Sequence, residues 1–223
     1  MPAWCATPRG LRHAKLLAEI YESVTVRPMT VVHFILWGLF SYLIGSVPTG
    51  FLWAKARGID IRAVGSGNIG ATNVMRALGK GPGITVLLID AAKGFLPVIL
   101  TKGQGPALQI VCCMCVIAGH NWTCWLKFKG GKGVATTAGA MLAILPVPLL
   151  CGLVVWGVVF GLSRYVSLAS ICGAVALPLA TLFRQPDFFL LTVLLSVIMI
   201  YKHTPNIRRL LAGTENRVGK KQP

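Results

Sequence analysis

Long apolar runs separated by short polar stretches fill most of the chain after residue 30. An α-helix needs about 20 apolar residues to cross a hydrocarbon core of about 30 Å, and most of these runs approach that length. One longer run, residues 134–162, holds 29 residues without a charge, and Pro146 and Pro148 mark the break expected within it. The expected spans are residues 31–53, 83–100 and 106–125, two short spans within 134–162, then 166–183 and 188–201. The pattern predicts an all-α integral membrane protein, a bundle of about seven transmembrane helices.

Composition agrees with a membrane protein. The chain is 55% hydrophobic and only 13% charged, whereas a soluble domain carries about 25% charged residues. Its 22 lysines and arginines exceed its 6 acidic residues and give a net charge of +16. No basic helix or aromatic-basic face accompanies that charge, so we expect no nucleic-acid partner. The excess instead favours loops held at an anionic membrane surface and an anionic substrate.

Positive charge is distributed unequally between alternate loops. Beyond residue 28, one set of alternate loops, with the C-terminus, holds fifteen lysines and arginines, and the other set holds only Lys102 and Arg184. The fifteen are Lys55, Arg57, Arg62, Arg76, Lys80, Lys127, Lys129, Lys132, Arg164, Lys202, Arg208, Arg209, Arg217, Lys220 and Lys221. Because positive residues in short loops favour the cytoplasmic side, we expect the richer loops and the C-terminus in the cytoplasm and the N-terminus outside.

The first 28 residues differ from the rest of the chain. They are polar and lack the apolar core of a secretory signal. Met29 stands directly before the first apolar run, so residues 1–28 are expected to be disordered or to precede the true start of translation. Residues 29–215 then form the transmembrane domain, and residues 216–223 form a basic cytoplasmic tail.

The polar stretch from Gly65 to Arg76 is the first candidate site. Its glycines permit positive φ angles that turn backbone N–H groups inward, as in an anion-binding nest. Arg76 adds a planar charged fork suited to phosphate. The short uncharged donors of the stretch are Ser66, Asn68, Thr72 and Asn73. A flexible hydrophilic connector is the alternative interpretation of this loop taken alone.

A second glycine-rich stretch lies before residue 134. Gly130, Gly131 and Gly133 permit a tight turn with exposed N–H groups, and Lys132 brings a charge into it. The helix beginning at Val134 would direct the positive end of its dipole to the same place. The spacing is not that of a Walker A loop. A basic juxtamembrane turn would explain the lysines but not three glycines in four positions, so we expect an anion site.

Two further pairs carry candidate chemistry. His203 and Asn206 would share a helix face, and histidine is the usual general base near neutral pH. The alternative is that His203 lies at the membrane interface without a catalytic or binding role. Asp90 and Lys93 also share a face within an expected span, where an ion pair limits the cost of burying charge. We favour a structural ion pair there over direct contact with a substrate.

Neither a metal nor a cofactor is expected. The acidic residues beyond residue 28 are Asp60, Asp90, Asp187 and Glu215. They are scattered along the chain, whereas a magnesium site needs clustered carboxylates. Cys112 and Cys115 have C-x-x-C spacing but no second pair, and they lie in an apolar run, so we expect packing rather than metal binding or redox chemistry.

The three polar elements together offer two anion-binding loops and a candidate base at the mouth of a hydrophobic bundle. With them, the sequence resembles the bacterial acyl-phosphate:glycerol-3-phosphate acyltransferases, the PlsY family. The matching stretches are residues 65–73 (GSGNIGATN), 119–122 (GHNW), 129–136 (KGGKGVAT), 164–170 (RYVSLAS) and 203–215 (HTPNIRRLLAGTE). The resemblance covers about residues 29–215, and only the N-terminal extension departs from the family pattern.

The resemblance implies a seven-helix enzyme of the bacterial cell inner membrane with its active site on the cytoplasmic side. It would transfer an acyl chain from acyl phosphate to the 1-hydroxyl of glycerol 3-phosphate, giving lysophosphatidic acid and phosphate in the first step of phospholipid synthesis. Its partners would be these two substrates and membrane lipids, with the enzyme that makes acyl phosphate as a further candidate.

The resemblance also assigns roles to residues. The expected catalytic residues are Ser66, Arg76, His203 and Asn206, and the expected substrate or phosphate contacts are Asn68, Thr72, Asn73, Gly130, Gly131, Lys132, Gly133 and Ser170. Glu215 would tie the tail to one of the loop cations. An acyl phosphate is already activated, so the enzyme must orient two mutually repelling anions and stabilise transition-state charge. The acceptor of the hydroxyl proton stays open between His203 and a substrate phosphate.

A transporter or channel for phosphate or organic anions is the alternative from another class. It should show an internal repeat or a pathway open to both sides of the membrane. No clear repeat is visible, and the outer side is nearly bare of polar groups. We therefore expect an enzyme.

Overall fold

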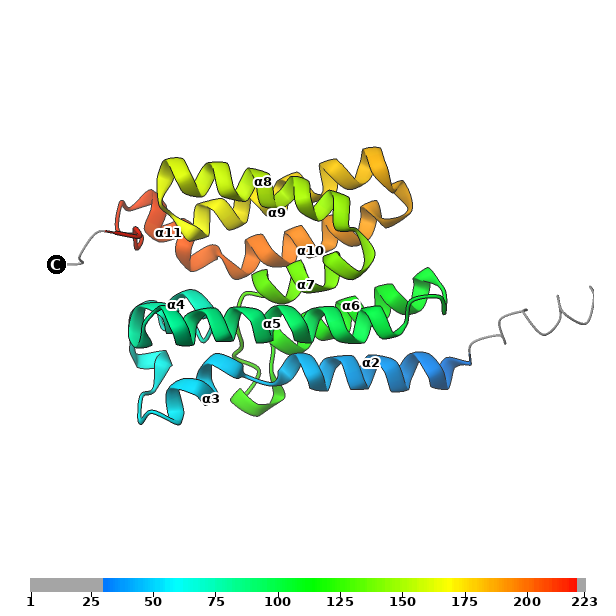
Figure 1. Ribbon diagram of the computed structural model, residues 1–223, viewed down its shortest axis with the longest axis horizontal. Helices are drawn as coiled ribbons and strands as arrows, with labels where there is room; N and C mark the ends of the chain where they lie inside the picture. The colour runs from blue at the N-terminus through cyan, green and yellow to red at the C-terminus, as the bar shows by residue number, and fades with distance from the viewer. Residues whose placement is uncertain (1–29, 220–223) are drawn as a thin grey trace, which may run out of the picture. The chain divides into compact units, whose positions relative to one another are not determined.

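The computed structural model describes residues 30–219, and their regular structure is entirely helical (Figure 1). The chain forms two units, residues 1–35 and 36–223; the first is described only over residues 30–35, which begin helix α2. The expectations for residues 1–28 and for the end of the tail lie outside the described residues. The helices are α2 (Val31–Ser46), α3 (Thr49–Lys55), η2 (Ile61–Ala63), α4 (Ala71–Leu78), α5 (Lys80–Leu100), α6 (Pro106–Asn121), η3 (Cys124–Leu126), α7 (Val134–Ile144), α8 (Pro146–Ser163), α9 (Val166–Arg184), η4 (Pro186–Phe188), α10 (Phe189–Lys202) and α11 (Thr204–Leu211).

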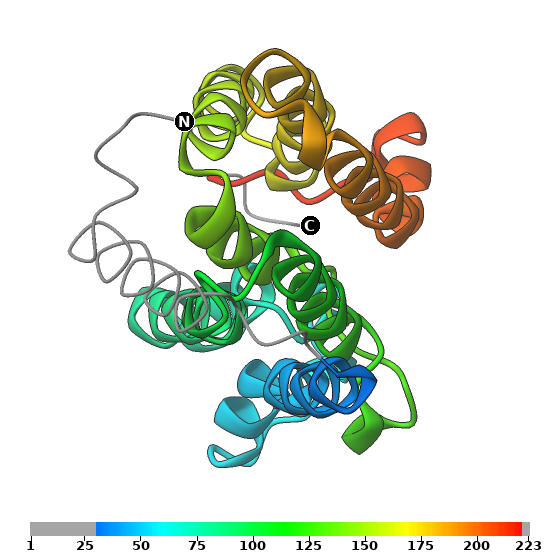
Figure 2. The ribbon, with the colours of Figure 1, turned by 90° about the vertical axis from the view of Figure 1, so that its right-hand side faces the viewer.

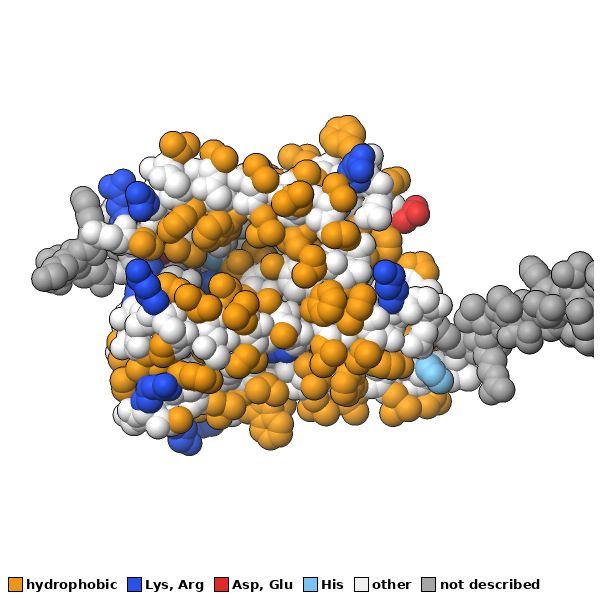
Figure 3. Space-filling view, in the orientation of Figure 1, with side chains coloured by type: hydrophobic (Ala, Val, Ile, Leu, Met, Phe, Trp, Pro, Cys, Tyr) orange, Lys and Arg blue, Asp and Glu red, His pale blue; other side chains and the backbone are white. Residues whose placement is uncertain are grey.

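Within the second unit, the helices form two packed groups that meet at α7. Helix α5 packs against α4, α6 and α7, and α9 packs between α8 and α10. Helix α7 contacts α8 as well as α5 and α6, and Figure 2 shows it lying between the two groups. Apolar side chains cover the long side of the unit seen in Figure 3. That surface is the one a lipid-facing bundle requires.

Five helical segments are long and apolar enough to cross a membrane. They are Val31–Lys55, Lys80–Leu100, Pro106–Leu126, Pro146–Ser163 and Val166–Arg184. A sixth is added if Pro186–Lys202 and Thr204–Leu211, bent by 57°, count as one span. These segments confirm the expected all-helical membrane protein over the described residues.

The expected pair of short spans within 134–162 needs correction. The chain does break where the prolines predicted, between α7 and α8. However, α8 has 18 residues and is a full span, whereas α7 has 11 and extends only about 16 Å at 1.5 Å per residue. By length, α7 alone cannot cross a hydrocarbon core of about 30 Å.

Pro48 divides the first span into α2 and α3, a break that the sequence analysis did not predict. A proline has no N–H and cannot continue the helical hydrogen bonds, so nearby carbonyls need other donors. Thr123 Oγ1 donates to Ser46 O at 2.5 Å, and Lys93 Nζ donates to Val47 O at 3.0 Å. Side chains from two other segments therefore stabilise the break.

The same lysine forms the predicted ion pair within α5. Lys93 Nζ lies 2.8 Å from Asp90 Oδ1, and both side chains are almost fully buried. The ammonium thus compensates a buried carboxylate and a freed carbonyl at once. These contacts support the structural interpretation of the pair.

Close backbone contact fixes the position of α7 against α5. A Cβ atom at Gly94 would lie 2.0 Å from Thr136 O, and one at Gly139 would lie 1.9 Å from Ala91 O. Only glycine permits such an approach at these two crossings. The start of α7 is therefore held firmly beside α5.

Candidate active site

Three donors meet the carboxylate of Glu215. Its Oε1 accepts from Asn206 Nδ2 at 2.6 Å and from Ser167 Oγ at 2.8 Å. Its Oε2 accepts from Arg209 Nε at 2.7 Å, and the glutamate side chain is only 4% exposed. Burial raises the pKa of Glu215, but the three hydrogen bonds outweigh burial and lower it overall. The carboxylate therefore ties the tail to α9 and α11.

Lys132 joins this network from the loop before α7. Its ammonium donates to Asn206 Oδ1, so the Asn206 amide bridges Lys132 and Glu215. Burial lowers the pKa of Lys132 to about 8; nearby cations add to that shift, and Glu215 opposes it. Lys132 is therefore charged at neutral pH and close to losing its proton. The resemblance implied that Glu215 ties the tail to a loop cation. Glu215 bonds directly to Arg209 of α11, and it is linked to the loop cation Lys132 through Asn206.

Arg76 lies within electrostatic reach of the same network. Arg76 belongs to α4 and is exposed as a whole residue. Partial burial of its guanidinium lowers its pKa; the charge of Arg209 adds to this shift, and the charge of Glu215 opposes it. A guanidinium stays charged in proteins, so the carboxylate of Glu215 pairs with Arg209 and also interacts electrostatically with Arg76 and Lys132. Blue side chains gather at this end of the unit, near α11, in Figure 3. The local excess of positive charge suits anionic ligands.

His203 stands at the start of α11 and is 2% exposed. Its Nδ1 lies 2.8 Å from Met199 O, an arrangement that assigns the ring proton to Nδ1 and leaves Nε2 as an acceptor. Burial lowers the pKa of His203 to about 4, and the charge of Lys132 adds to the shift while the bond to Met199 opposes it. The imidazole is therefore neutral near pH 7. Asn206 N donates to His203 O at 2.8 Å, so both residues lie in the first turn of α11.

The loop before α4 is held by the side chain of Asn73. Its Oδ1 accepts from Ser66 N at 2.9 Å, and its Nδ2 donates to two loop carbonyls at 2.9 and 3.1 Å. Both ends of this amide are thus engaged, and the residue is 1% exposed. Asn73 therefore shapes the loop through both ends of its amide, and its contact with an anion stays a prediction. Gly65 and Gly67 have the positive φ angles that the sequence predicted, +59° and +70°, whereas Gly70, predicted with them, has an extended backbone with φ of −76°.

The remaining polar residues of this loop surround the start of α4. Ser66, Asn68 and Thr72 are partly exposed. Gly70 caps the helix without a side-chain hydrogen bond, so the first N–H groups of α4 are open to other acceptors. This arrangement suits an anion, as predicted, although the second half of the expected loop is helical from Ala71 onward.

The loop before α7 differs from its prediction in one respect. The N–H groups of Gly130 and Gly131, expected to be exposed, donate to Asn121 O at 3.2 Å and to His120 O at 3.0 Å. A Cβ atom at either glycine would also lie 2.1 Å from an atom of His120. Glycine is required here because the loop packs directly on the end of α6. The anion-binding groups that remain are Lys132 and the start of α7.

Ser170 lies away from the Glu215 network. Its hydroxyl donates to Val166 O at 2.8 Å and accepts from Trp156 Nε1 at 3.2 Å, which links α9 to α8. Ser167, one turn earlier, is the serine that enters the network. The sequence pattern predicted Ser170 and not Ser167 as a site residue, although both serines lie in one helical turn and in the same motif. The two serines differ only in the hydrogen-bond partners that the tertiary structure gives to their hydroxyl groups.

The site contains cations and neutral donors but no metal-binding cluster. Within residues 30–219, no three His, Cys, Asp or Glu side chains are grouped so as to hold a metal ion. Cys112 and Cys113 are buried free thiols in α6, consistent with packing. Such an arrangement can bind anions, orient a hydroxyl group and stabilise negative charge.

Comparison with known proteins gives consistent matches. The family model described as glycerol-3-phosphate acyltransferase matches residues 35–213. The chain is 49% identical over 187 residues to a glycerol-3-phosphate acyltransferase of Desulforamulus reducens, covering 82% of this chain and 94% of that protein. It is 43% identical over 202 residues to one of Shouchella clausii, covering 86% and 98%.

A solved structure shares the fold. The crystal structure of PlsY, an integral membrane glycerol 3-phosphate acyltransferase in its glycerol 3-phosphate form, superposes with a TM-score of 0.80. The two chains are 38% identical, and the match covers 83% of this chain and 96% of that one. A second form of PlsY, with lysophosphatidic acid, gives a TM-score of 0.78.

Proposed function

Because the chain belongs to the glycerol-3-phosphate acyltransferase family, and is an integral membrane acyltransferase of phospholipid synthesis, we propose that its acyl donor is an acyl phosphate. The proposed products are 1-acylglycerol 3-phosphate (lysophosphatidic acid) and inorganic phosphate. One observation carries this proposal: Lys132 is held by Asn206, beside Arg76 and the neutral His203, at one end of an apolar bundle. The site thus provides cations for two phosphoryl groups.

In the proposed reaction, the C1 hydroxyl oxygen of glycerol 3-phosphate attacks the acyl carbonyl carbon. The bond between that carbon and the bridging phosphate oxygen breaks, and phosphate leaves with the bonding electron pair. The hydroxyl proton is transferred to a base, so the new ester is neutral and the phosphate is released. Lys132 and Arg76 hold the two anions in place and offset their repulsion. Ser66, Asn68 and Thr72, with the start of α4, add neutral donors to one phosphoryl group.

The proton most readily ends on the leaving phosphate. The second pKa of a phosphate monoester is about 6, and it rises when the phosphate leaves as the free ion, whereas burial holds the pKa of His203 at about 4. The stronger base of the two is therefore the phosphate. We assign His203 Nε2 to accept a hydrogen bond from the attacking hydroxyl and so orient it. Asn73 and Ser170 are assigned to positioning, because their side chains bond within the protein.

The acyl donor can be tested directly. Purified protein supplied with glycerol 3-phosphate and either acyl phosphate or acyl-CoA is expected to form lysophosphatidic acid only from acyl phosphate. The cations of the site suit a phosphoryl leaving group. The measurement is product formation by mass spectrometry. Equal rates with both donors, or product from acyl-CoA alone, would contradict the proposal; no product at all would favour the transporter.

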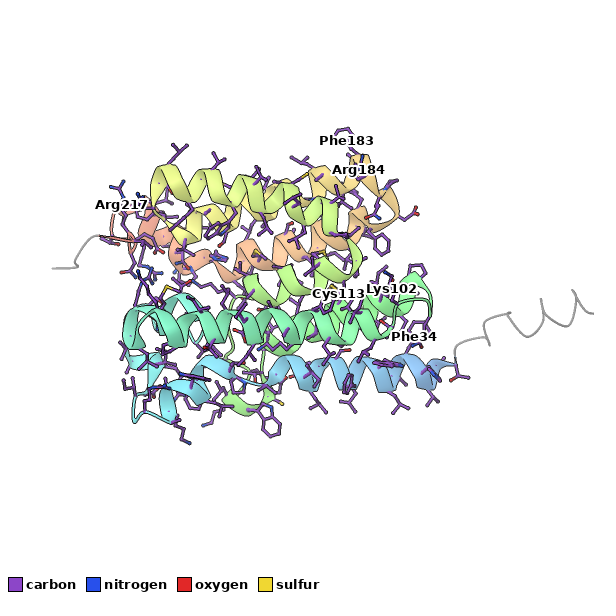
Figure 4. The ribbon with its side chains drawn as sticks, in the orientation of Figure 1. Phe34, Lys102, Cys113, Phe183, Arg184 and Arg217 are labelled. Carbon is purple, nitrogen blue, oxygen red and sulfur yellow. The ribbon has the colours of Figure 1, made fainter. Side chains whose placement is uncertain are left out.

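We further propose seven crossings of a bacterial inner membrane, with the site in the cytoplasm. Lys132, before α7, and Ser163, the last residue of α8, both contact the same end of the bundle, through Asn206 and Arg217. Because α8 is long enough to span alone, the proposal requires α7, which is too short to cross by itself, to make the preceding crossing together with the loop residues at its two ends. Figure 4 shows Arg217 at one end and Lys102 and Arg184 at the other, which supports the orientation from the positive-inside rule.

Cysteine labelling tests this orientation. In a Cys124→Ser background, Arg217→Cys is expected to react with a membrane-impermeant maleimide only in inverted vesicles, because the reagent must meet the cytoplasmic face. Lys102→Cys should react only from outside, in intact cells; both positions are exposed. Labelling of both variants from the same side would refute the topology.

A further inference from the structure

Lys202 ends α10 and makes its contacts outside its own helix. It is the last residue of α10, directly before His203 and the 57° bend between α10 and α11. Its side chain is half-buried, and its Nζ donates to the backbone oxygen of Asn121 at 2.9 Å. The same ammonium lies 5.3 Å from the centre of the Trp122 ring, a distance at which a cation is attracted to an aromatic face. Lys202 therefore holds the end of α6 through a hydrogen bond and a cation–π contact.

The end of α6 is a firm anchor for that lysine. The last carbonyl groups of an α-helix have no donor within the helix and carry partial negative charge, so they attract cations. Asn121 is the last residue of α6, and Trp122 caps the helix. The Trp122 oxygen accepts from Tyr42 Oη at 2.8 Å, and Thr123 Oγ1 donates to Ser46 O at 2.5 Å. Two bonds to α2 thus fix the segment that the lysine contacts.

The loop before α7 is fastened to the same carbonyl group. Asn121 O accepts from Gly130 N at 3.2 Å as well as from the Lys202 ammonium. Lys132 stands two residues beyond Gly130. His203 stands directly after Lys202. One oxygen atom therefore joins the backbone that carries Lys132 to the backbone that carries His203, with few bonds on either side.

We infer that Lys202 is a positioning residue for acyl transfer, because its bond to the end of α6 sets the place of His203 relative to Lys132. The inference rests on the proposed function, in which His203 orients the attacking hydroxyl and Lys132 holds a phosphoryl group. Lys202 itself bonds to protein groups, so its contribution is the alignment of the two halves of the site. Alignment of bound reactants acts on kcat, since a shift of about 1 Å can cost about a hundredfold in rate. Contact with a substrate would act on a binding constant instead.

The test compares Lys202→Met and Lys202→Arg with the wild-type enzyme. Methionine keeps an unbranched side chain that packs on the Trp122 ring, but it loses the charge and the donor. Arginine keeps both, because a guanidinium donates to carbonyl groups and stacks on aromatic faces. In Lys202→Met we expect kcat to fall about ten- to a hundredfold. The KM for either substrate and the inhibition constant of inorganic phosphate should change by less than about threefold. Lys202→Arg should restore kcat to within about threefold of the wild type.

Lys80→Met is the matched control, because it removes an exposed lysine at the start of α5; its constants should equal those of the wild type. Lys202→Gln, which is neutral and shorter than lysine, is a second removal variant and should repeat the loss of kcat. The result then does not depend on the folding of Lys202→Met. All variants are assayed at a temperature where thermal unfolding shows them folded, so a loss of stability alone does not lower kcat.

Unchanged kcat in the removal variants would overturn the inference, and so would a loss that Lys202→Arg does not restore. A rise of about tenfold or more in one KM or in the phosphate inhibition constant would overturn it as well, because Lys202 would then contact a ligand. The wild type is assayed first with acyl phosphate and with acyl-CoA, and the variants with the donor that it uses. An incorrect donor assignment is therefore recognised separately, as is a wild type that forms no product with either donor, which would refute the proposed function itself.

Discussion

Replacing Lys132 with alanine is expected to lower kcat/KM by about a hundred- to a thousandfold, or about 3–4 kcal/mol of transition-state stabilisation. Of the lysines in the loop before α7, Lys132 is the one whose ammonium bonds to Asn206, and this hydrogen bond directs it into the network. Without it, two phosphoryl groups would approach each other with less compensating charge. Steady-state kinetics with both substrates varied would measure the loss.

The same lysine predicts the pH dependence. Burial lowers the pKa of Lys132 to about 8, so the required charge is present below that pH and lost as the pH rises through it. The kcat/KM profile should therefore have a basic limb near pH 8. In Lys132→Arg the limb should move beyond pH 10, because a guanidinium keeps its proton. Bound anions stabilise the ammonium, so the limb in kcat should lie at higher pH than that in kcat/KM.

Lys129→Ala is the matched control, since Lys129 is an exposed lysine of the same loop. Its activity and pH profile should equal those of the wild type. If Lys132→Ala kept wild-type turnover, or if Lys132→Arg kept the limb near pH 8, Lys132 would not be the charge that holds the substrates.

Replacing Glu215 with glutamine is expected to destabilise the protein by about 2–3 kcal/mol and to reduce activity together with stability. Both carboxylate oxygens accept, from Ser167 and Asn206 on one side and from Arg209 on the other. An amide has one acceptor oxygen, so at least one donor loses its partner and Arg209 loses its counter-charge. Thermal unfolding in a lipid-like detergent would measure the stability.

The Glu215→Gln change also affects activity, because Asn206, which orients Lys132, would lose its bond to the carboxylate. Turnover should therefore fall even at temperatures where Glu215→Gln is fully folded. Asp187→Asn serves as the control, because Asp187 is an exposed carboxylate after α9 and should tolerate the change. A glutamine variant with the wild-type unfolding temperature would show that the carboxylate is not what joins the tail to α9 and α11.

Some of this site was readable from residue type and spacing. Glycines at 65 and 67 predicted positive φ angles, and the structure has them, because few other residues adopt that conformation. His203 and Asn206 stand three apart, and both occupy the first turn of α11. Local spacing decides such features, so the sequence sufficed for them.

The spacing of residues along the chain did not predict their hydrogen-bond partners. Ser167 and Ser170 lie one turn apart, yet only Ser167 meets Glu215, 48 positions away. The glycines before α7 suggested free N–H groups, but the end of α6 accepts two of them. Asn73 carries the same amide as Asn206, and its donors and acceptor are used within its own loop. Which polar group remains available depends on what the fold places beside it.

The sequence by itself determined a helical membrane protein and the proline break between α7 and α8, and it predicted two anion-binding loops and a candidate base. Hydropathy, helix length and backbone preference act over short stretches of chain, so they can be read in order along it. Only the tertiary structure decided that Lys132, Asn206 and Glu215 form one network and that α7 is a half-length helix. Those features arise from packing between segments that are distant in sequence. Whether a side chain forms a hydrogen bond there depends on which neighbours the fold places beside it, and local sequence patterns do not contain that information.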